Sequence, residues 1–532
     1  MKHVFLFGIF GWLLSFTLVA QTGIWQWSVP VRNFSTHPKN PESRAYLWIP
    51  GQCEQVKAIL VAQHNMEEIS ILEDEAFRQR MAELDVAQIW VCPSFNHGFD
   101  FTDGAWETLD GLLADLAEES GYKELSTAPL IAIGHSAAAS WPYYLAAYKP
   151  ERTLACISVS GQWPYHRDRW LCPDIWGERN INKIPCLETM GEYESAHTWS
   201  NEGLKERKEH PLLPLSMLAC PEGHFAYTPE KAQYIALYIK KAMHYGHVDP
   251  TKEGWLMERW KKNEKPSCIP APVNQFKGDP AQAFWFFDRE MIEATLAYQS
   301  RYYDMKPQLV SVSQNGKTVS QQNTHLQVHP AFIPQEDGIT FQLTPVFLDT
   351  VPGESPRLSN WTDLPVGASI GHAGKAPVLQ MITGPVVLVD SVTFRIQWNR
   401  GTLWTDKKSD IVFSITHPGD EEYKPAVQQA QITIPVKNTE GQQQYIKFAT
   451  LPDIKRGTKY VSLSAVSSCG LPVDFYVESG PAYVDGNRLI LTAIPPKTTY
   501  PVKVTVIAWQ YGKNSDPKIK TAEPVKQTFY IR

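Results

Sequence analysis

The chain has 532 residues, a length typical of two or three domains. Hydrophobic residues make up 43% and charged residues 20%, which is the composition of a globular protein with ample material for a core. The formal net charge is −6, and no block of Lys and Arg is long enough to neutralise a run of phosphates. We therefore expect no nucleic-acid partner.

The first twenty residues have the pattern of a secretory signal. Lys2 and His3 precede an apolar run over residues 4–20, which ends in the small residue Ala20. The run is interrupted by glycine and serine and is short for a membrane span. We predict a signal peptide over residues 1–20 and a secreted or periplasmic bacterial protein without stable membrane insertion; an uncleaved anchor is the alternative.

Eight cysteines are spread along the chain. Four lie in apolar, strand-like segments, where we expect buried thiols: Cys92, Cys156, Cys186 and Cys220. Any pairing among the others stays open: Cys53, Cys172, Cys268 and Cys469. Neither a CxxC nor an HExxH motif occurs, so we expect no metal and no cofactor.

Between about residues 25 and 247, short apolar runs alternate with segments of helical spacing. The expected strands are Gly23–Val31, Arg44–Ile49, Lys57–Gln63, Gln88–Cys92, Pro129–Ile133, Thr153–Ser158, Ile184–Met190 and Leu215–Cys220. The expected helices are Ile71–Leu84, Trp106–Ser120, Ala137–Tyr148 and Pro229–Tyr245. The middle strands are apolar on both faces, as strands covered by helices on both sides must be. This alternation predicts an α/β fold with a doubly wound, mostly parallel sheet over residues 21–248.

The pattern changes after residue 248. Residues 249–305 are rich in aromatic side chains and partly helical, and we interpret them as a bridge that packs on the first domain. After Lys306, alternating β-branched residues and Pro/Gly turns predict all-β sandwich modules over residues 306–445 and 446–532. The stretch SLSAVSSCGLPVDFYVESGPAYVDGNRLILTA in the last module resembles bacterial Ig-like repeats. In that family the module is mostly a spacer or an adhesion domain.

A candidate nucleophile follows one of the apolar strands. In PLIAIGHSAAASWPYY, Ser136 stands between a strand and a helix-forming stretch, with the small residues Gly134 and Ala138 on either side. A tight strand–turn–helix that lifts a serine Oγ above a sheet needs such small neighbours. The segment resembles the nucleophile elbow of the α/β-hydrolase superfamily, with Ala138 in place of the usual Gly. We therefore predict a serine hydrolase with Ser136 as nucleophile.

A serine nucleophile requires a base, which is held in place by an acid. The resemblance implies the order Ser, acid, His along the chain, with each partner after a strand end. His224 follows the apolar run LSMLAC and is the predicted base. Glu194, a few residues past Gly191, is the predicted acid, and Glu192 is the alternative.

The tetrahedral intermediate of such a reaction needs two backbone N–H donors. The resemblance implies that one is Ala137, directly after the nucleophile. The other is expected in the loop after AILVAQ, where many relatives read His-Gly and this chain reads His64-Asn65-Met66. Met66 is the predicted second member of the oxyanion hole, and Asn65 is the alternative.

The segment GQWPYHRDRWLCPDIWG follows the strand that precedes Ser160, at the same sheet edge as the elbow. Flat aromatic rings suit sugars or phenolic acyl groups, and Arg suits a carboxylate. The predicted substrate-binding residues are Trp163, Tyr165 and Arg167, with Trp170, Trp176 and Arg169 nearby. A lid packed for stability is the alternative.

The aromatic loop, the signal and the Ig-like stretch together resemble exported carbohydrate esterases, which remove acyl or methyl groups from plant polysaccharides. This resemblance implies an ester-decorated glycan or oligosaccharide as the substrate of a Ser-His-Glu carboxylic-ester hydrolase. Two alternatives stay open. One is a secreted serine peptidase or lipase, and the other is a catalytically dead glycan-binding or adhesion protein.

Overall fold

The computed structural model describes residues 24–38, 40, 42–167, 172–194, 196–220, 223–224, 227–322, 327–353 and 361–532. The predicted signal peptide, residues 1–20, lies outside the described residues. The same holds for Arg169 and Trp170 of the predicted substrate loop.

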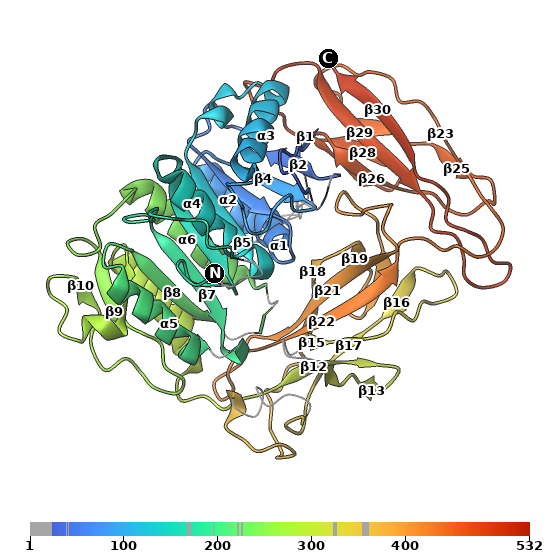
Figure 1. The fold of residues 1–532 in the computed structure, drawn as a ribbon. Helices are drawn as coiled ribbons and strands as arrows, with labels where there is room; N and C mark the ends of the chain where they lie inside the picture. Colours follow the sequence, from blue (N-terminus) through green and yellow to red (C-terminus); the bar gives the residue numbers. More distant parts are fainter. Residues whose placement is uncertain are drawn as a thin grey trace, which may run out of the picture.

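An eight-stranded sheet organises the first half of the chain, in the order β1-β2-β4-β3-β5-β6-β7-β8 (Figure 1). Its strands are β1 Trp27–Pro30, β2 Arg44–Trp48, β3 Ala58–Gln63, β4 Val86–Cys92, β5 Leu130–His135, β6 Thr153–Val159, β7 Cys186–Gly191 and β8 Leu215–Cys220. Strands β1 and β2 are antiparallel to their neighbours, and the pairs from β4 to β8 are parallel. The predicted doubly wound, mostly parallel sheet is confirmed.

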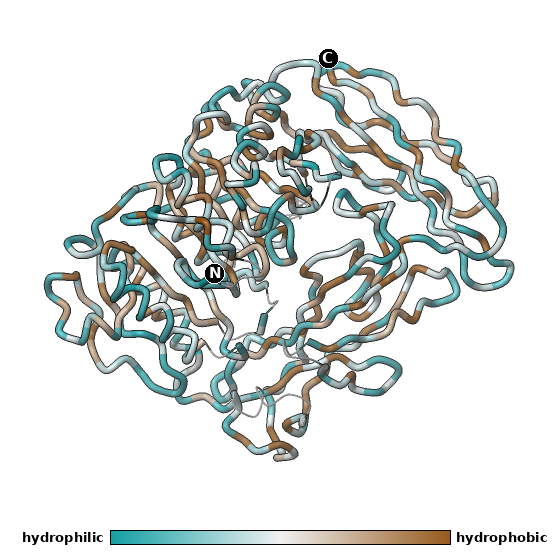
Figure 2. Tube along the Cα trace, viewed as in Figure 1, coloured by the Kyte–Doolittle hydropathy of each residue, from teal (hydrophilic) through white to brown (hydrophobic). Residues whose placement is uncertain are grey.

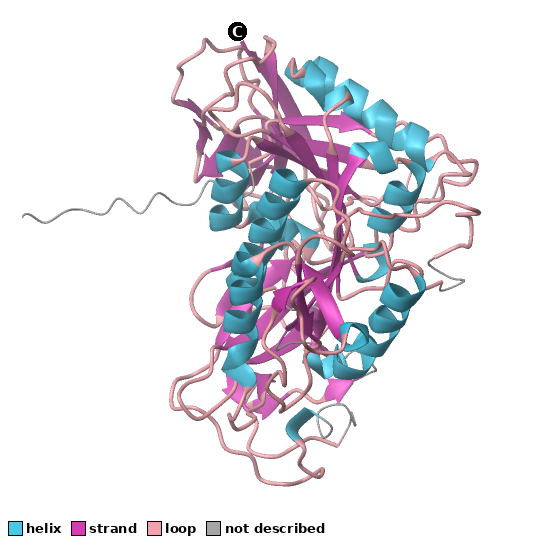
Figure 3. Ribbon diagram, turned by 90° about the vertical axis from the view of Figure 1, so that its left-hand side faces the viewer, coloured by secondary structure: helices cyan, strands magenta, loops and turns pink. Residues whose placement is uncertain are grey.

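Helices cover both faces of this sheet (Figure 3). They are α1 Glu68–Glu73, α2 Glu75–Glu83, α3 Ala105–Ser120, α4 Trp141–Tyr148, α5 Ala196–Glu209 and α6 Pro229–Tyr245. The single helix expected over Ile71–Leu84 is two helices, because Asp74 is extended and its side chain caps α2 by accepting the N–H of Phe77 at 2.7 Å. Helix α5 was not among the predicted helices.

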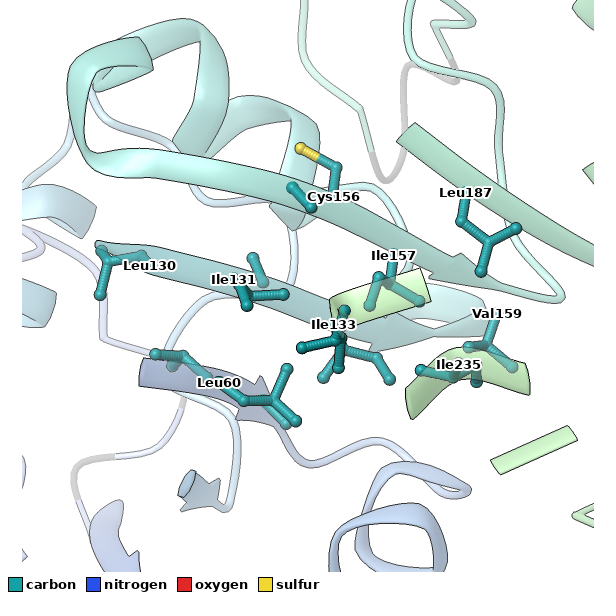
Figure 4. Close-up of a cluster of buried hydrophobic side chains, with 14 of the residues drawn as sticks. Leu60, Leu130, Ile131, Ile133, Cys156, Ile157, Val159, Leu187 and Ile235 are labelled. Carbon is teal, nitrogen blue, oxygen red and sulfur yellow. The ribbon is translucent and has the colours of Figure 1, made fainter. Parts of the chain in front are cut away.

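The central strands are apolar on both faces because both faces are buried. Leu60 of β3, Ile133 of β5, Ile157 of β6 and Ile235 of α6 are fully buried and belong to one cluster (Figure 4). In Figure 2 the strands of this sheet are mainly hydrophobic, and hydrophilic segments lie mostly toward the outside. Each such side chain contributes about 1.5–3 kcal/mol on burial. The sheet is therefore a rigid support for the loops at its carboxyl edge.

Residues 249–305 add a small sheet, β10-β9-β11, and one helix beside β8. The elements are β9 Trp255–Glu258, β10 Ala271–Pro272, β11 Ala283–Phe286 and α7 Arg289–Gln299. Trp285 is fully buried in the cluster that fills the central sheet, and its Nε1 donates to Glu253 O at 2.8 Å. Ser216 Oγ of β8 donates to Trp285 O at 2.6 Å. This segment therefore shares the core of the first half of the chain.

The rest of the chain forms small sheets around two larger hydrophobic clusters, with a third, small cluster of Leu309, Trp361 and Ile370. The strands up to residue 445 are β12 Val310–Gln314, β13 Lys317–Thr318, β14 Gln321–Gln322, β15 Gln327–Val328, β16 Thr340–Gln342, β17 Thr344–Phe347, β18 Val378–Thr383, β19 Val386–Leu388, β20 Thr393–Ile396, β21 Lys408–His417 and β22 Ala426–Pro435. Those after it are β23 Ile446–Phe448, β24 Tyr460–Ser462, β25 Ala465–Ser467, β26 Asp474–Ser479, β27 Ala482–Asp485, β28 Arg488–Leu491, β29 Val502–Trp509 and β30 Val525–Ile531.

These sheets fit the expected β-sandwich modules, while the Ig-like resemblance and the domain boundaries stay predictions. The first cluster runs from Val310 to Val436 but also contains Trp509 and Tyr511 of the last region. The second cluster runs from Ile446 to Ile531. The two β-rich regions are thus joined by shared packing.

The β-rich regions also contact the edge of the large sheet. Tyr46 Oη of β2 donates to Arg400 O at 3.1 Å, and Ser70 Oγ of α1 donates to Ile382 O of β18. The N–H of Gly480 donates to Trp25 O at 3.1 Å. These contacts hold the β-rich regions against the half of the chain that carries the predicted nucleophile.

All eight cysteines lie in the described part of the chain, and none of them forms a disulfide. Cys92, Cys156, Cys186 and Cys220 are buried thiols, as predicted, and Cys53 and Cys172 are buried too. Among the helices described, none combines the length and apolar character that a membrane crossing requires.

Replacing Trp285 tests whether residues 249–305 belong to the central core. Trp285→Ala should lower the free energy of unfolding by about 3–5 kcal/mol, as loss of a large buried aromatic side chain does. Ile269→Ala in the same segment, where the side chain is 84% exposed, should change it by less than about 0.5 kcal/mol. Thermal midpoints from circular dichroism compare the two variants. Equal midpoints would contradict the shared core.

Candidate active site

Ser136 occupies the sharp turn between β5 and α4. Its φ is +53°, a left-handed conformation that is uncommon for a residue with a side chain. A Cβ at Gly134 would lie 1.8 Å from Ala138 O, so this position admits no side chain. Ala138 is fully buried and fits where a Gly was expected. The tight packing of these small residues holds Ser136 in its strained conformation.

The structure brings Ser136, His224 and Glu194 together. Ser136 Oγ and His224 Nε2 are 2.5 Å apart, and His224 Nδ1 and Glu194 Oε2 are 2.8 Å apart. Glu194 ends a short helical turn after β7, and His224 follows β8, so both lie at the sheet edge that carries the elbow. In this arrangement the imidazole can take the serine proton while the carboxylate fixes its tautomer.

Of the two candidate acids, Glu194 is the one that contacts His224. Glu192 begins the same turn but is buried elsewhere, where Lys262 and Lys424 are the nearest charges that act on it. Burial raises the pKa of the Glu192 carboxyl well above its usual range. A carboxyl group that stays protonated cannot stabilise an imidazolium.

A buried carboxylate ties the loop after β3 to the elbow. Glu68 accepts the N–H of His135 at 2.8 Å with one oxygen. Its other oxygen accepts the N–H of Met66 at 2.8 Å and that of Asn65 at 3.1 Å. Burial raises the pKa of Glu68 to about 7, although these hydrogen bonds favour the ionised form. One side chain thus fixes the backbone on both sides of the site.

This finding corrects the prediction for the second oxyanion donor. The N–H of Met66 is directed at Glu68 and not at the space above Ser136, and the N–H of Asn65, the alternative, shares the same acceptor. The Asn65 side chain is also engaged, since its Nδ2 donates to His135 O at 2.9 Å. Ala137 is half-buried at the start of the turn after the nucleophile, and its role stays a prediction.

A second buried polar group lies next to His135, which contacts the predicted base His224. Lys231 Nζ and Glu67 Oε1 form a fully buried ion pair at 2.6 Å. His135 Nε2 lies 2.7 Å from His224 O, and burial lowers the pKa of His135 well below its usual range. Since a carbonyl oxygen can only accept, His135 Nε2 donates to the backbone of His224. Sequence reasoning missed these residues; their signal was the pair of acids Glu67 and Glu68, separated by three residues from the apolar run AILVAQ.

Trp163, predicted to bind substrate, is part of the core instead. It is fully buried and stacks between Phe284 and Trp199, with ring centroids 5.7 and 6.2 Å away. Its Nε1 donates to Trp199 O at 2.9 Å. Trp176 is buried as well. For these two residues the alternative of a loop packed for stability is the correct one.

Tyr165 and Arg167 belong to the same packed group. The Tyr165 ring stacks on His210 with centroids 3.5 Å apart, and the Arg167 guanidinium lies 4.2 Å from the centre of the Trp176 ring. Arg167 also donates to Pro164 O at 2.8 Å. The contacts described for the two side chains are within this group, so the structure does not bring them together with the Ser-His-Glu arrangement.

No protein-family model and no curated protein sequence matches the chain. Among solved structures it is similar to Est1E from Butyrivibrio proteoclasticus, with 14% identity, coverage of 41% of this chain and 100% of that chain, and a TM-score of 0.28. It is also similar to the Bacillus cereus carboxylesterase, with 16% identity, coverage of 38% of this chain and 96% of that chain, and a TM-score of 0.27. A third similar structure is dienelactone hydrolase from Anabaena variabilis, with 14% identity, coverage of 41% of this chain and 98% of that chain, and a TM-score of 0.29. Likenesses of this level say nothing about the substrate of this chain.

The two acids can be distinguished by isosteric replacement. Glu194→Gln should lower kcat by a factor of about 10²–10⁴, because an amide cannot stabilise the imidazolium or hold the tautomer. Glu192→Gln, the matched control, should change kcat by less than about threefold, since Glu194 and not Glu192 contacts His224. Initial rates on a small ester measure both. The reverse ranking would move the acid to Glu192.

Glu68 gives a pH dependence of stability with a defined sign. Between its usual pKa of about 4.5 and its folded pKa of about 7, the folded chain keeps a proton that the unfolded chain has lost. The contribution of Glu68 to the free energy of unfolding is therefore fully present below pH 4.5, and it falls by about 3 kcal/mol as the pH rises through 7. The Glu68→Gln variant has no carboxyl group at this position, so its stability lacks this pH dependence.

The thermal midpoint of the wild type, relative to that of Glu68→Gln, should thus decrease from pH 4.5 to 7.5. A difference between the two proteins that does not change with pH would contradict the raised pKa of Glu68.

Proposed function

We propose that the chain is a secreted serine hydrolase of the α/β-hydrolase type that cleaves carboxylic esters. Ser136 is the nucleophile, His224 the base and Glu194 the acid. The observation that carries this proposal is the continuous contact from Ser136 Oγ through the imidazole to Glu194, at 2.5 and 2.8 Å. The left-handed backbone at Ser136 supports it, because such strain is typical of functional positions.

In the first half of the reaction, Ser136 Oγ attacks the ester carbonyl carbon while His224 Nε2 takes the hydroxyl proton. Glu194 stabilises the imidazolium that forms. The negative charge on the former carbonyl oxygen accepts the N–H of Ala137, at the start of the turn after the nucleophile. His224 then returns the proton to the leaving alkoxide, the alcohol departs, and an acyl-enzyme remains.

In the second half, a water molecule gives a proton to His224 Nε2 as its oxygen attacks the acyl carbon. The tetrahedral intermediate collapses, the C–Oγ bond breaks, and the proton on His224 returns to Ser136 Oγ. The carboxylic acid leaves, and the starting state is restored. No step requires a group beyond the chain, the ester and water.

The proposed substrates are acyl or methyl ester decorations of polysaccharides. The signal-like N-terminus and the stretch that resembles Ig-like repeats support an exported enzyme that meets such material. The aromatic loop no longer supports this substrate, because Trp163 is packed in the core. The complete Ser-His-Glu contact favours a hydrolase over a catalytically dead adhesion protein.

The test uses p-nitrophenyl acetate and a fluorophosphonate probe, which labels an activated serine. Ser136→Ala and His224→Ala should each lower kcat at least about 10³-fold and abolish labelling, because the three residues act as one unit. Ser300→Ala, at an exposed serine remote in sequence from the site, is the control and should behave as the wild type. Wild-type turnover in Ser136→Ala would overturn the assignment.

The same proteins define the ester class. The wild type should release acid or methanol from at least one of acetylated, feruloylated and methyl-esterified polysaccharides, and Ser136→Ala should not. Hydrolysis confined to peptides or long-chain triacylglycerols would instead support a peptidase or lipase.

A further inference from the structure

A cavity of about 1130 Å³ lies between the large sheet and the β-rich regions. Most of its lining comes from three parts of the chain: the loop after β3 with α1, strands β18 and β19 with residues 397–412, and residues 472–487 around β26 and β27. Trp90 and Tyr227 are among the remaining lining residues. Figure 1 shows β18 near α1, and these two elements contact each other. Cavities for compact ligands measure about 300–1,000 Å³, so this one has room for an extended ligand.

The cavity borders residues that neighbour the proposed catalytic residues. Asn65 lines it, and the same side chain donates to the carbonyl of His135, the residue before Ser136. Tyr227, three residues after His224, lines it as well. Ser136, His224 and Glu194 themselves are not among its lining residues, so an ester substituent must extend beyond the cavity to meet Ser136.

Hydrogen bonds between the three parts fix the walls in place. Ser70 Oγ donates to Ile382 O, which joins α1 to β18. Gln397 Nε2 donates to Phe475 O at 3.3 Å, which joins the two β-rich regions. Arg400 Nη2 donates to Val477 O, also at 3.3 Å. A preformed cavity costs little ordering entropy when a ligand binds.

The lining combines flat rings with amide side chains. The rings of Tyr476 and Tyr483 are partly exposed, whereas those of Trp90, Tyr227 and Phe475 are largely buried in the wall. The amides belong to Asn65, Gln397, Asn399 and Asn487. Aromatic rings pack on the apolar faces of sugars, and amides both donate to and accept from hydroxyl groups. This is the chemistry that a hydroxyl-rich chain requires.

Three lining residues carry a buried nitrogen that makes no hydrogen bond within the described part of the chain: His64 Nδ1, Trp90 Nε1 and Arg400 Nη1. For Arg400 Nη1 the ion-pair partner, Glu73 Oε1, is 3.8 Å away. Each buried unsatisfied polar group costs about 1–3 kcal/mol. These nitrogens lie beneath the surface of the wall, so a ligand in the preformed cavity does not contact them.

The charge of the lining distinguishes between classes of polysaccharide. Five carboxylates face two cations; the carboxylates are Glu73, Asp74, Asp406, Asp410 and Asp474, and the cations are Arg400 and Lys408. Asp474 is paired with Arg395 at 2.5 Å, which still leaves four carboxylates to two cations. Such a surface repels a polyuronate and admits a neutral chain.

We propose that this cavity binds the sugar chain of a neutral glycan and presents its ester substituents to Ser136. Presentation of the ester to Ser136 rests on the proposed function, whereas binding of the sugar chain does not. The proposal gives the β-rich regions a part in substrate recognition, since they supply two of the three walls.

The experiment measures binding without ester hydrolysis. The full wild-type chain is titrated calorimetrically with de-esterified xylan, de-esterified glucomannan and polygalacturonate. At least one neutral chain should bind, and polygalacturonate should bind at least about tenfold more weakly. Tyr483→Ala and Asn487→Ala, each at a partly or largely exposed position of the wall, should each weaken neutral-chain binding about tenfold.

The matched control is Tyr445→Ala, at a tyrosine that is 71% exposed in the same region but does not belong to the wall. This variant should bind as the wild type does, and all three variants should keep the far-UV circular dichroism spectrum of the wild type. The proposal is overturned if no neutral chain binds, if polygalacturonate binds best, or if the wall variants and the control bind alike. If the chain binds glycan but hydrolyses no ester, the proposed function fails and the cavity assignment stands.

Discussion

A parallel sheet with both faces covered leaves one place for polar chemistry, the edge where its strands end. In this chain β3, β5, β7 and β8 end together, and the residues that follow them are the loop with Glu68, Ser136, Glu194 and His224. The apolar packing of the strands places these residues with respect to one another. Loss of packing between the strands would therefore disturb the site without touching any of its side chains.

Apolar packing does not orient the buried polar side chains near the site; hydrogen bonds and an ion pair do. The Glu68 carboxylate accepts three backbone N–H groups, and the Glu67–Lys231 pair is completely buried. Removing one partner of such a pair leaves an uncompensated charge, which costs about 3–5 kcal/mol. Burial thus makes these residues as necessary for the local geometry as the residues proposed to react.

The fold and the Ser-His-Glu contact could be predicted because their signals are local. Apolar runs bounded by turns mark the strands, and the small residues around Ser136 mark the elbow. Trp163 could not be placed, since its partner Phe284 is 121 positions away in the sequence (284 − 163). Helix α5 escaped prediction for a related reason: its buried face is small and polar, with Ser200 and Gly203, and Gly203 faces the Trp163 ring. The direction of the Met66 N–H depends on the burial of Glu68, which no periodicity indicates.

The shared packing of the two β-rich regions has a consequence for synthesis on the ribosome. The cluster between Val310 and Val436 includes Trp509 and Tyr511, which follow it by more than seventy residues. During translation that cluster lacks two of its aromatic side chains until the end of the chain emerges, while the large sheet already has all of its strands. The half of the molecule with the predicted nucleophile can therefore fold first. The cavity between that half and the β-rich regions forms last.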